Sequence, residues 1–497
     1  MMAPIVGAIG ERPTIVVLSR LVMVPLVLIS VALAWRIGVG LYSKRAALWA
    51  AAATLLIPDF ALGSVEYRTD QLWTVAWMAT LAVICLGHAT MRRVFLAGVL
   101  LGICFCVSMK TSILITSFAL GCGTAAFLAR RRGLSLGAGR LTFLAAAGGA
   151  GALVVPALMI IYFASKGALS GLWYGAVEHN IVPSLGSWGH TSARVLLLPL
   201  SLPILLWIGR SVTTGAPDPS LGVRRGALFL GAGLYYVSIV AVWPLVTRQD
   251  FLPLIPMAAV AVTPYLVSVA EWAESRRTLT PLYRACRYAP SLALILTAAK
   301  TQAIEPAWRD NDVGVHEAFV EEVLRMTRPQ DLVMDVKGET IFRARPCYYA
   351  FEPVTNARIE SGALRDSIAE RLVETRTPIA VQDSPEFPEK GRSFLIGNYV
   401  SAGSLRYAGA ELDPPDRQGV RRFTIHVPQR YELVSDRGPV GGSLDGSPFD
   451  GARELAAGSH VFQGVPKEGM IDAVWAEAIA RGTSPFPANT RHRIRTR

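Results

Sequence analysis

Residues 14–35 read TIVVLSRLVMVPLVLISVALAW, and this stretch decides the class of fold. Arg20 is its only charged residue. Because about 20 apolar residues in a helix cross the hydrocarbon core of a bilayer, the stretch predicts a membrane-spanning helix. Further apolar segments follow up to residue 300, so we predict about ten spans: 14–35, 46–64, 71–88, 94–109, 112–129, 141–164, 193–209, 226–247, 251–270 and 286–300.

The composition also indicates lipid as the surrounding solvent. Of the 497 residues, 52% are apolar and 17% are charged, whereas about 25% of residues are charged in a typical soluble domain. The net charge is +12, but the basic residues form short clusters between apolar segments, which argues against nucleic-acid binding. The six cysteines lack the spacing of a zinc site or a disulfide framework, so we predict that they act only as small apolar side chains in packing.

The basic clusters occupy alternate loops of the predicted spans. With ten spans they fall on one side, which the positive-inside rule makes the cytoplasm. This orientation puts both chain ends on the outer side, so we predict that the C-terminal domain lies outside the cytoplasm. The clusters are Arg36, Lys44 and Arg45; Arg92 and Arg93; Arg130, Arg131, Arg132 and Arg140; Arg210, Arg224 and Arg225; and Arg276, Arg277, Arg284 and Arg287.

Few charged residues lie at the opposite ends of the spans, where such groups usually face a cavity or a partner. We predict that Arg68 and Asp70 shape an external cavity and that Lys110 and Arg248 bind the phosphate of a lipid. The alternatives are a solvated turn at Arg68 and Asp70 and a snorkelling side chain at Lys110. The sequence has no glycine loop of the nucleotide-binding kinds, which favours a donor that arrives through the membrane.

The loop from 166 to 194 is rich in side chains suited to sugars. Trp173 and Tyr174 offer aromatic faces, while Glu178 and His190 offer groups for sugar hydroxyls, so we predict that this loop binds the sugar or the acceptor. Glu178 and His179 could also hold a divalent metal, although a metal site normally needs three or four ligands.

The order of the elements resembles that of a known enzyme family. The basic segment RIGVGLYSKRAALWA at 36–50 is followed by LIPDF at 56–60, EYRTD at 66–70 and GVLLGICFCVSMK at 98–110. Val177–His179 and TRQDFLPLIP at 247–256 follow later. This order resembles the polyprenol-phosphate-sugar glycosyltransferases of the protein mannosyltransferase and aminoarabinose transferase type, which have the GT-C architecture. The resemblance covers roughly residues 1–300.

The resemblance implies a bacterial inner-membrane protein with a periplasmic C-terminal domain. It also implies inverting transfer of a sugar from an undecaprenyl-phosphate donor to a periplasmic lipid, glycan or protein. A carboxylate would act as general base and cations would stabilise the departing phosphate. It also implies that His179 binds a metal. The family's catalytic carboxylate lies between its first two spans, and residues 1–12 correspond to the tail of that loop. We therefore expect the general-base aspartate and a first helix upstream of Met1, and we do not assign the role to Glu11.

The composition changes after residue 300. Residues 301–430 are predicted to form a small α/β domain, with strands at 331–335 and 379–382 and a helix at 363–375 between them. Residues 431–480 are predicted to form hairpins, with a turn rather than a calcium loop at 441–446, and residues 481–497 to be a disordered tail. The candidate acceptor-binding residues in this part are Arg343, Arg345, Tyr348 and Tyr349.

Two other functions remain open. A transporter or flippase of lipid-linked glycans would often show internal repeats and broken helices at mid-membrane, whereas the polar residues here lie at the span ends and no repeat is evident. A non-catalytic relative that assists envelope assembly is the other alternative, because residues 1–12 supply no suitable catalytic carboxylate.

Overall fold

The computed structural model describes residues 3–130, 138–182, 185, 193–276, 281, 285–304, 311–382 and 384–486. The chain forms two compact units. Residues 17–311 make one of them, which we call the helical unit. Residues 1–16 and 312–497 make the other, which we call the mixed unit.

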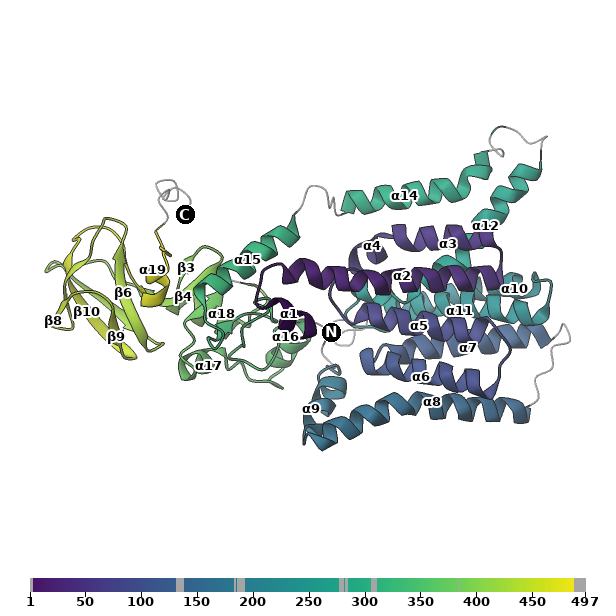
Figure 1. Cartoon of the computed structure of the whole chain (residues 1–497), viewed down its shortest axis with the longest axis horizontal. Coiled ribbons are helices and arrows are strands. Elements are labelled where there is room, and N and C mark those ends of the chain that lie inside the picture. Colours follow the sequence, from purple (N-terminus) through teal and green to yellow (C-terminus); the bar gives the residue numbers. More distant parts are fainter. Residues whose placement is uncertain are drawn as a thin grey trace. The chain divides into compact units, whose positions relative to one another are not determined.

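The helical unit consists of helices that run back and forth in a bundle (Figure 1). The long helices are α2 (Ile15–Leu41), α7 (Thr111–Arg130), α8 (Ala138–Ser165), α10 (Leu197–Thr214), α11 (Pro219–Val242) and α12 (Leu254–Ser275). The shorter ones are α3 (Lys44–Leu56), α4 (Pro58–Gly63), α5 (Asp70–Cys85), α6 (Met91–Val107), α9 (Leu169–Trp173) and α14 (Ala289–Ile304). The short segments η1 (Tyr174–Glu178), η3 (Ala193–Leu196), η4 (Arg248–Phe251) and η5 (Cys286–Tyr288) lie between helices.

Each of the ten predicted spans overlaps at least one of these helices, but the span predicted at 46–64 is divided at Ile57 into α3 and α4, because Pro58 begins a new helix. Within the described residues, six helical segments are long and apolar enough to cross a membrane: 15–41, 111–130, 142–165, 193–214, 219–242 and 254–275. The predicted spans that fall outside this set correspond to α3, α5, α6 and α14, whose lengths are 13 to 17 residues. The predicted class, a multi-span helical membrane protein followed by a domain of helices and strands, is confirmed.

Arginines from alternate loops meet at one end of the bundle, which we call the basic end. Arg225 donates to the carbonyl of Leu41 at the end of α2, at 2.7 Å, and Arg224 to that of Cys85 at the end of α5, at 3.1 Å. Arg45 forms two hydrogen bonds with Glu274 near the end of α12. Cations stabilise helix C-termini because the last carbonyls lack partners within the helix. The contacts confirm that these loops share one end of the unit.

Small residues allow α6 and α8 to pack with their backbones close together (Figure 1). A Cβ atom on Gly98 would collide with the carbonyl oxygen of Gly148, and one on Gly102 would lie 2.7 Å from that of Ala152. This is the small-residue packing typical of membrane helices, in which close backbone approach increases van der Waals contact. The apolar part of α8 is only 6% buried, so α8 lines the rim of the bundle, with α6 behind it.

The mixed unit contains two β-sheets and several short helices. The larger sheet has the order β1-β2-β4-β11-β6-β9, with β3 also paired to β4, and the smaller has the order β5-β10-β7-β8. The larger sheet contains β1 (Val333–Met334), β2 (Ile379–Val381), β3 (Tyr399–Ala402), β4 (Leu405–Glu411), β6 (Gln429–Ser435), β9 (Arg453–Leu455) and β11 (Ile471–Trp475). The smaller contains β5 (Val420–Ile425), β7 (Gly441–Leu444), β8 (Ser447–Phe449) and β10 (Gly458–Val465).

The predicted α/β part is present. β1 and β2 pair in parallel, and helices α16 (Pro353–Glu360) and α17 (Ile368–Glu374) lie between them in the chain. The other helices of the unit are α1 (Ala3–Ile9), α15 (Asp312–Met326), α18 (Glu389–Asn398) and α19 (Ala476–Ala480). The predicted division at 430/431 falls inside β6. The reason is that β11, the last strand among the described residues, pairs with both β4 and β6 and joins the two halves in one sheet.

The turn predicted at 441–446 is shorter in the structure, because residues 441–444 form strand β7 and only Asp445 and Gly446 make the turn. Asp445 and Gly446 both have positive φ, 52° and 77°, and connect the antiparallel strands β7 and β8. An Asp-Gly pair suits such a two-residue hairpin, because both central residues need left-handed backbone angles. The carboxylate of Asp445 also accepts a hydrogen bond from the Nδ1 of His460, at 2.7 Å.

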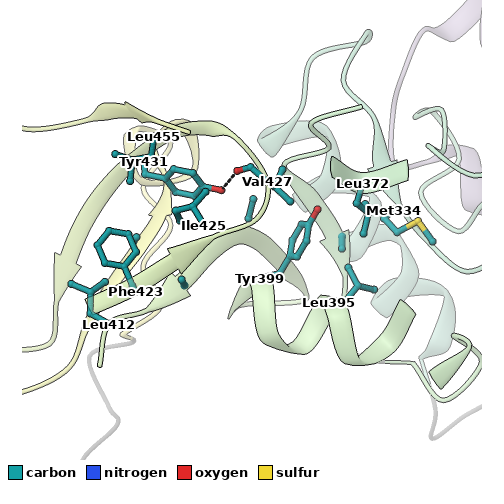
Figure 2. Close-up of a cluster of buried hydrophobic side chains, with 14 of the residues drawn as sticks. Met334, Leu372, Leu395, Tyr399, Leu412, Phe423, Ile425, Val427, Tyr431 and Leu455 are labelled. Carbon is teal, nitrogen blue, oxygen red and sulfur yellow. Dashed lines mark hydrogen bonds between the residues drawn. The ribbon is translucent and has the colours of Figure 1, made fainter. Parts of the chain in front are cut away.

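A continuous apolar core joins the two sheets to the helices of the mixed unit. Figure 2 shows part of it, with Tyr399, Phe423 and Tyr431 among the labelled side chains. The hydroxyl of Tyr431 donates to the carbonyl of Val427 at 2.6 Å, so the buried polar atom of this side chain is satisfied.

The first residues of the chain pack on the mixed unit. Ile15 and Val16 form a buried cluster with Val320 of α15, and Glu11 forms an ion pair with Arg343 at 2.8 Å. Arg343 also donates to Thr327, at 2.6 Å, while Arg345 pairs with the buried Asp335, at 2.7 Å. Both guanidinium groups, which the sequence suggested for acceptor binding, therefore make contacts that hold this unit together.

Candidate functional site

Polar side chains gather at the end of the helical unit opposite the basic end, which we call the mixed-charge end. Three segments meet there: the α4–α5 segment 58–70, the turn that carries Lys110, and residues 247–250. Three of the four groups of outer-face residues predicted from the sequence are thus brought together.

Lys110 lies in the tight turn between α6 and α7. Its ammonium group donates to the carboxylate of Asp250 and lies 5.3 Å from the ring centroid of Trp243. A cation near an aromatic face is attracted by the ring's negative potential. The side chain of Lys110 is 22% exposed and that of Asp250 only 1%, so the ammonium is held in place but still accessible.

Asp250 is a structural member of the site. One carboxylate oxygen receives the ammonium of Lys110, and the other receives the backbone N–H of Thr247 at 2.9 Å. The hydroxyl of Tyr235, in α11, donates to the backbone carbonyl of Asp250 at 2.9 Å. Because both of its carboxylate oxygens are occupied, Asp250 is suited to positioning Lys110 rather than to accepting a proton.

The residues before Asp250 attach this segment to the α4–α5 segment. The Nε of Arg248 lies 3.7 Å from a carboxylate oxygen of Asp59, and the amide of Gln249 donates to Glu66 at 3.0 Å. Arg248 also lies against Gly63, where a Cβ atom would be 3.3 Å from its Cδ. Arg248 is therefore fixed over the short helix α4, beside a carboxylate.

Arg68 and Asp70 form a local pair at the start of α5. The Nε of Arg68 donates to Asp70 at 3.0 Å, and the arginine side chain is 54% exposed. Asp70 occupies the first turn of the helix, where a negative charge is favourable. The predicted cavity-shaping pair thus exists, but its exposure and local geometry also fit the solvated turn that was its alternative.

An apolar groove lies between the last turn of α6 and the residues of α8, α9 and η1. It has a volume of about 500 Å³ and is lined by Phe105 and Cys106 of α6, by Pro156 and Ile160 of α8, and by Trp173 and other residues of α9 and η1. Cys106 precedes Lys110 by four positions in the chain, but the ammonium of Lys110 contacts Asp250 and Trp243 and is not part of the groove lining.

The predicted sugar loop is described only in part. Trp173 ends α9 and is 62% exposed, while Tyr174 and Glu178 begin and end the π-helical segment η1. The rings of Tyr174 and His179 lie 5.7 Å apart. His190 lies outside the described residues. Among those described, no three His, Cys, Asp or Glu side chains are grouped to hold a metal ion, so the metal role of His179 remains a prediction.

Sequence analysis did not assign roles to Asp250, Tyr235 or Trp243. For Asp250 a signal was available, because Thr247 and Asp250 have the spacing of a helix-capping pair. Trp243 is the residue that follows α11, and its position in the sequence carries no signal for this role. Its contact with Lys110 depends on how α11 packs against α7, which the sequence does not reveal.

Comparisons with known proteins leave the family open. No family model and no curated protein matches the sequence. Among solved structures, the chain is similar to the crystal structure of the Archaeoglobus fulgidus oligosaccharyltransferase in complex with Zn and sulfate. The TM-score is 0.36 and the identity 14%, over 78% of this chain and 61% of that one, so the chain spans less than two thirds of its length. A match at this level carries no functional argument.

Proposed function

We propose that this protein is a membrane glycosyltransferase that uses a polyprenyl-phosphate-linked sugar as donor. The observation that carries the proposal is the position of Lys110, whose ammonium group is held by Asp250 just after α6, the helix whose last turn also lines an apolar groove. A polyprenyl phosphate needs both features close together: a cation for its phosphate and an apolar surface for its chain.

The charges at the mixed-charge end fit the departure of a lipid phosphate. In the transfer, the bond between the sugar's anomeric carbon and the phosphate oxygen breaks, and the phosphate keeps the electron pair. A bond forms from the acceptor hydroxyl to the same carbon, and the hydroxyl proton passes to a carboxylate. Lys110 and Arg248 would stabilise the charge that develops on the phosphate, and the acceptor would be a lipid, glycan or protein on the outer side.

Lys110 and Arg248 are suited to this role in different ways. Lys110 keeps two N–H donors after its bond to Asp250, and a compact ammonium is a common phosphate ligand. Arg248 lies 3.7 Å from Asp59, a long contact, and Asp59 is half-exposed. A phosphate that approached Arg248 would compete with the carboxylate of Asp59 for the guanidinium.

The groove is suited to an isoprenoid chain. Its lining side chains are mainly aliphatic and aromatic, and exposed apolar residues of α8, among them Ile160, Ile161 and Tyr162, adjoin it. The aromatic ring of Trp173 belongs both to this lining and to the predicted sugar loop. The lipid chain and the sugar that it carries would thus meet at the end of α6.

Binding of undecaprenyl phosphate to the full chain, measured by native mass spectrometry from detergent, tests the proposal. The Lys110→Ala variant is expected to bind at least tenfold more weakly, because a charge-assisted contact is worth about 1.5–3 kcal/mol. Lys44→Ala, which removes the same kind of side chain at the basic end, is expected to bind as the wild type does. Equal binding by all three proteins would contradict the phosphate role, and transfer of radiolabelled sugar from membrane lipid would then be examined in the same variants.

A further inference from the structure

The mixed unit contains a cavity whose charged lining the proposed function does not use. It has a volume of about 590 Å³ and lies where α18 and β3 face β4, β5, β10 and β11. Its carboxylates are Glu411, Asp413 and Asp472, and its guanidinium is that of Arg422. Three carboxylates and one guanidinium give the lining a net charge of −2 when all four groups are ionised.

Asp472 is the buried member of this group. It is 7% exposed, is the second residue of β11, and lines the cavity. No hydrogen bond or ion pair from the described part of the chain reaches its carboxylate. Buried carboxylates are normally hydrogen-bonded or paired, because removal from water is costly for a charge. An unpaired one that borders a cavity therefore indicates a missing partner.

Negatively charged neighbours of Asp472 indicate that the missing partner is a cation. Strands β11 and β4 are antiparallel, and Asp472 lies directly opposite Glu411. Side chains in such a pair are about 5 Å apart at Cβ, and like charges there are destabilising. Burial, and then the charges of Glu411 and Asp436, raise the pKa of Asp472 to about 7.

The other groups that line the cavity do not neutralise Asp472. His460 is engaged by the carboxylate of Asp445 and by the carbonyl of Ala456, at 2.7 and 2.9 Å. The ring of His426 packs edge-on against Phe394, and Arg422 forms no ion pair with any described residue.

An organic cation fits this geometry better than a metal ion. In the described ranges no three His, Cys, Asp or Glu side chains are placed to coordinate a metal together, although three carboxylates line this cavity. An ammonium group does not need a closed coordination shell, because it donates three separate hydrogen bonds. A volume of about 590 Å³ also exceeds what an ion needs and lies within the range of small-molecule sites.

We propose that this cavity binds an amine-bearing small molecule, whose ammonium group lies between Asp472 and Glu411. Asp413 is the third carboxylate of the lining and would be available to a second ammonium group, so a diamine complements the cavity. The pairing register of β11 and β4 brings the two carboxylates together, because Asp472 lies directly opposite Glu411. The site is independent of the proposed transfer reaction, because its residues belong to the mixed unit alone.

Isothermal titration calorimetry with the full chain in nanodiscs of zwitterionic lipid tests the site. The probes are 1,4-diaminobutane and its neutral analogue 1,4-butanediol, with empty nanodiscs as the blank. We expect the diamine to bind and the diol not to. Asp472→Asn, which keeps the shape of the side chain, is expected to weaken diamine binding about tenfold or more. Asp450→Asn removes an exposed carboxylate outside the cavity and is expected to bind as the wild type does.

The unfolding temperature of each variant, measured in parallel, separates a lost site from a lost fold. Asp472→Asn should be at least as stable as the wild type, because it removes an unpaired buried charge. If the diamine fails to bind the folded wild type, binds Asp472→Asn equally well, or binds no better than the diol, the proposed site is wrong.

Discussion

Lys110 and Asp250 lie 140 positions apart in the sequence and form an ion pair at the mixed-charge end of the helical unit. The aspartate is almost fully buried and the lysine is partly accessible, so the pair presents a cation while its counterion is hidden. This arrangement holds the end of α6 to the segment before α12. The same ion pair therefore stabilises the helical unit and holds the ammonium group that we propose binds the phosphate.

Removal of one partner should destabilise the helical unit. Lys110→Met leaves a buried carboxylate without its cation, which costs about 3 kcal/mol. Asp250→Asn keeps the hydrogen bond from the backbone of Thr247 but loses the charge. We expect the double variant to be more stable than the sum of the single effects predicts, which thermal unfolding in detergent, followed by tryptophan fluorescence, can measure. Strict additivity would show that the two side chains are not coupled.

The close packing of α6 and α8 gives a second prediction. A Cβ atom on Gly151 would collide with the backbone of Phe95, whereas one on Gly149, two positions earlier in the same helix, would meet no atom within 4 Å. Gly151→Leu should therefore destabilise the unit by about 1–3 kcal/mol through overpacking. Gly149→Leu is the matched control and should unfold at the wild-type temperature, and equal losses would argue against the α6–α8 contact.

Trp173 should contribute to lipid binding if the groove holds an isoprenoid chain. Trp173→Ala removes a large aromatic face from the lining and should weaken undecaprenyl phosphate binding several-fold. Trp207→Ala, in α10, removes a tryptophan that is 72% exposed and outside the groove. If both variants lose affinity to the same extent, the effect is general and the groove is not the site.

The stability of the mixed unit should depend on pH through Asp472. Its pKa of about 7 in the folded protein lies above the ordinary aspartate value of about 3.9. Between those values the folded protein keeps a proton that the unfolded chain has lost, so stability falls as the pH rises through this window. The Asp472→Asn variant cannot titrate at this position, so about 2–4 kcal/mol of the fall in unfolding free energy should be absent from it.

Urea unfolding of the wild type and of Asp472→Asn at about pH 5 and about pH 9 measures the difference. The stability gained by the variant should be larger at the higher pH, and Asp450→Asn should show no such change. A gain that is the same at both pH values would mean that Asp472 does not titrate in this range.

Labelling of single introduced cysteines tests the sidedness. Tyr67→Cys is exposed at the mixed-charge end, and Arg92→Cys is exposed at the basic end. If the basic end is cytoplasmic, a membrane-impermeant maleimide should label Tyr67→Cys in intact cells and should label Arg92→Cys only after lysis. The reverse pattern would move Lys110 and Arg248 to the cytoplasmic side and exclude a donor site on the outer side. The unsubstituted protein gives the background from its own cysteines.

Local patterns determined much of this structure. Long apolar segments such as 14–35 predict helices because the need to satisfy backbone polar groups in lipid allows little else. Arginine clusters identified the ends that share one side, and Asp445-Gly446 identified a hairpin turn. These features follow from hydropathy, charge or backbone angles within a few residues.

Tertiary structure alone decided the long-range pairs. The contact of Lys110 with Asp250 depends on how α7 and α11 pack, and the burial of Asp472 depends on the insertion of β11 between β4 and β6. The association of residues 1–16 with the mixed unit is of the same kind. Many partners are compatible with a lone lysine or aspartate in a sequence, and only the packing of distant elements selects one.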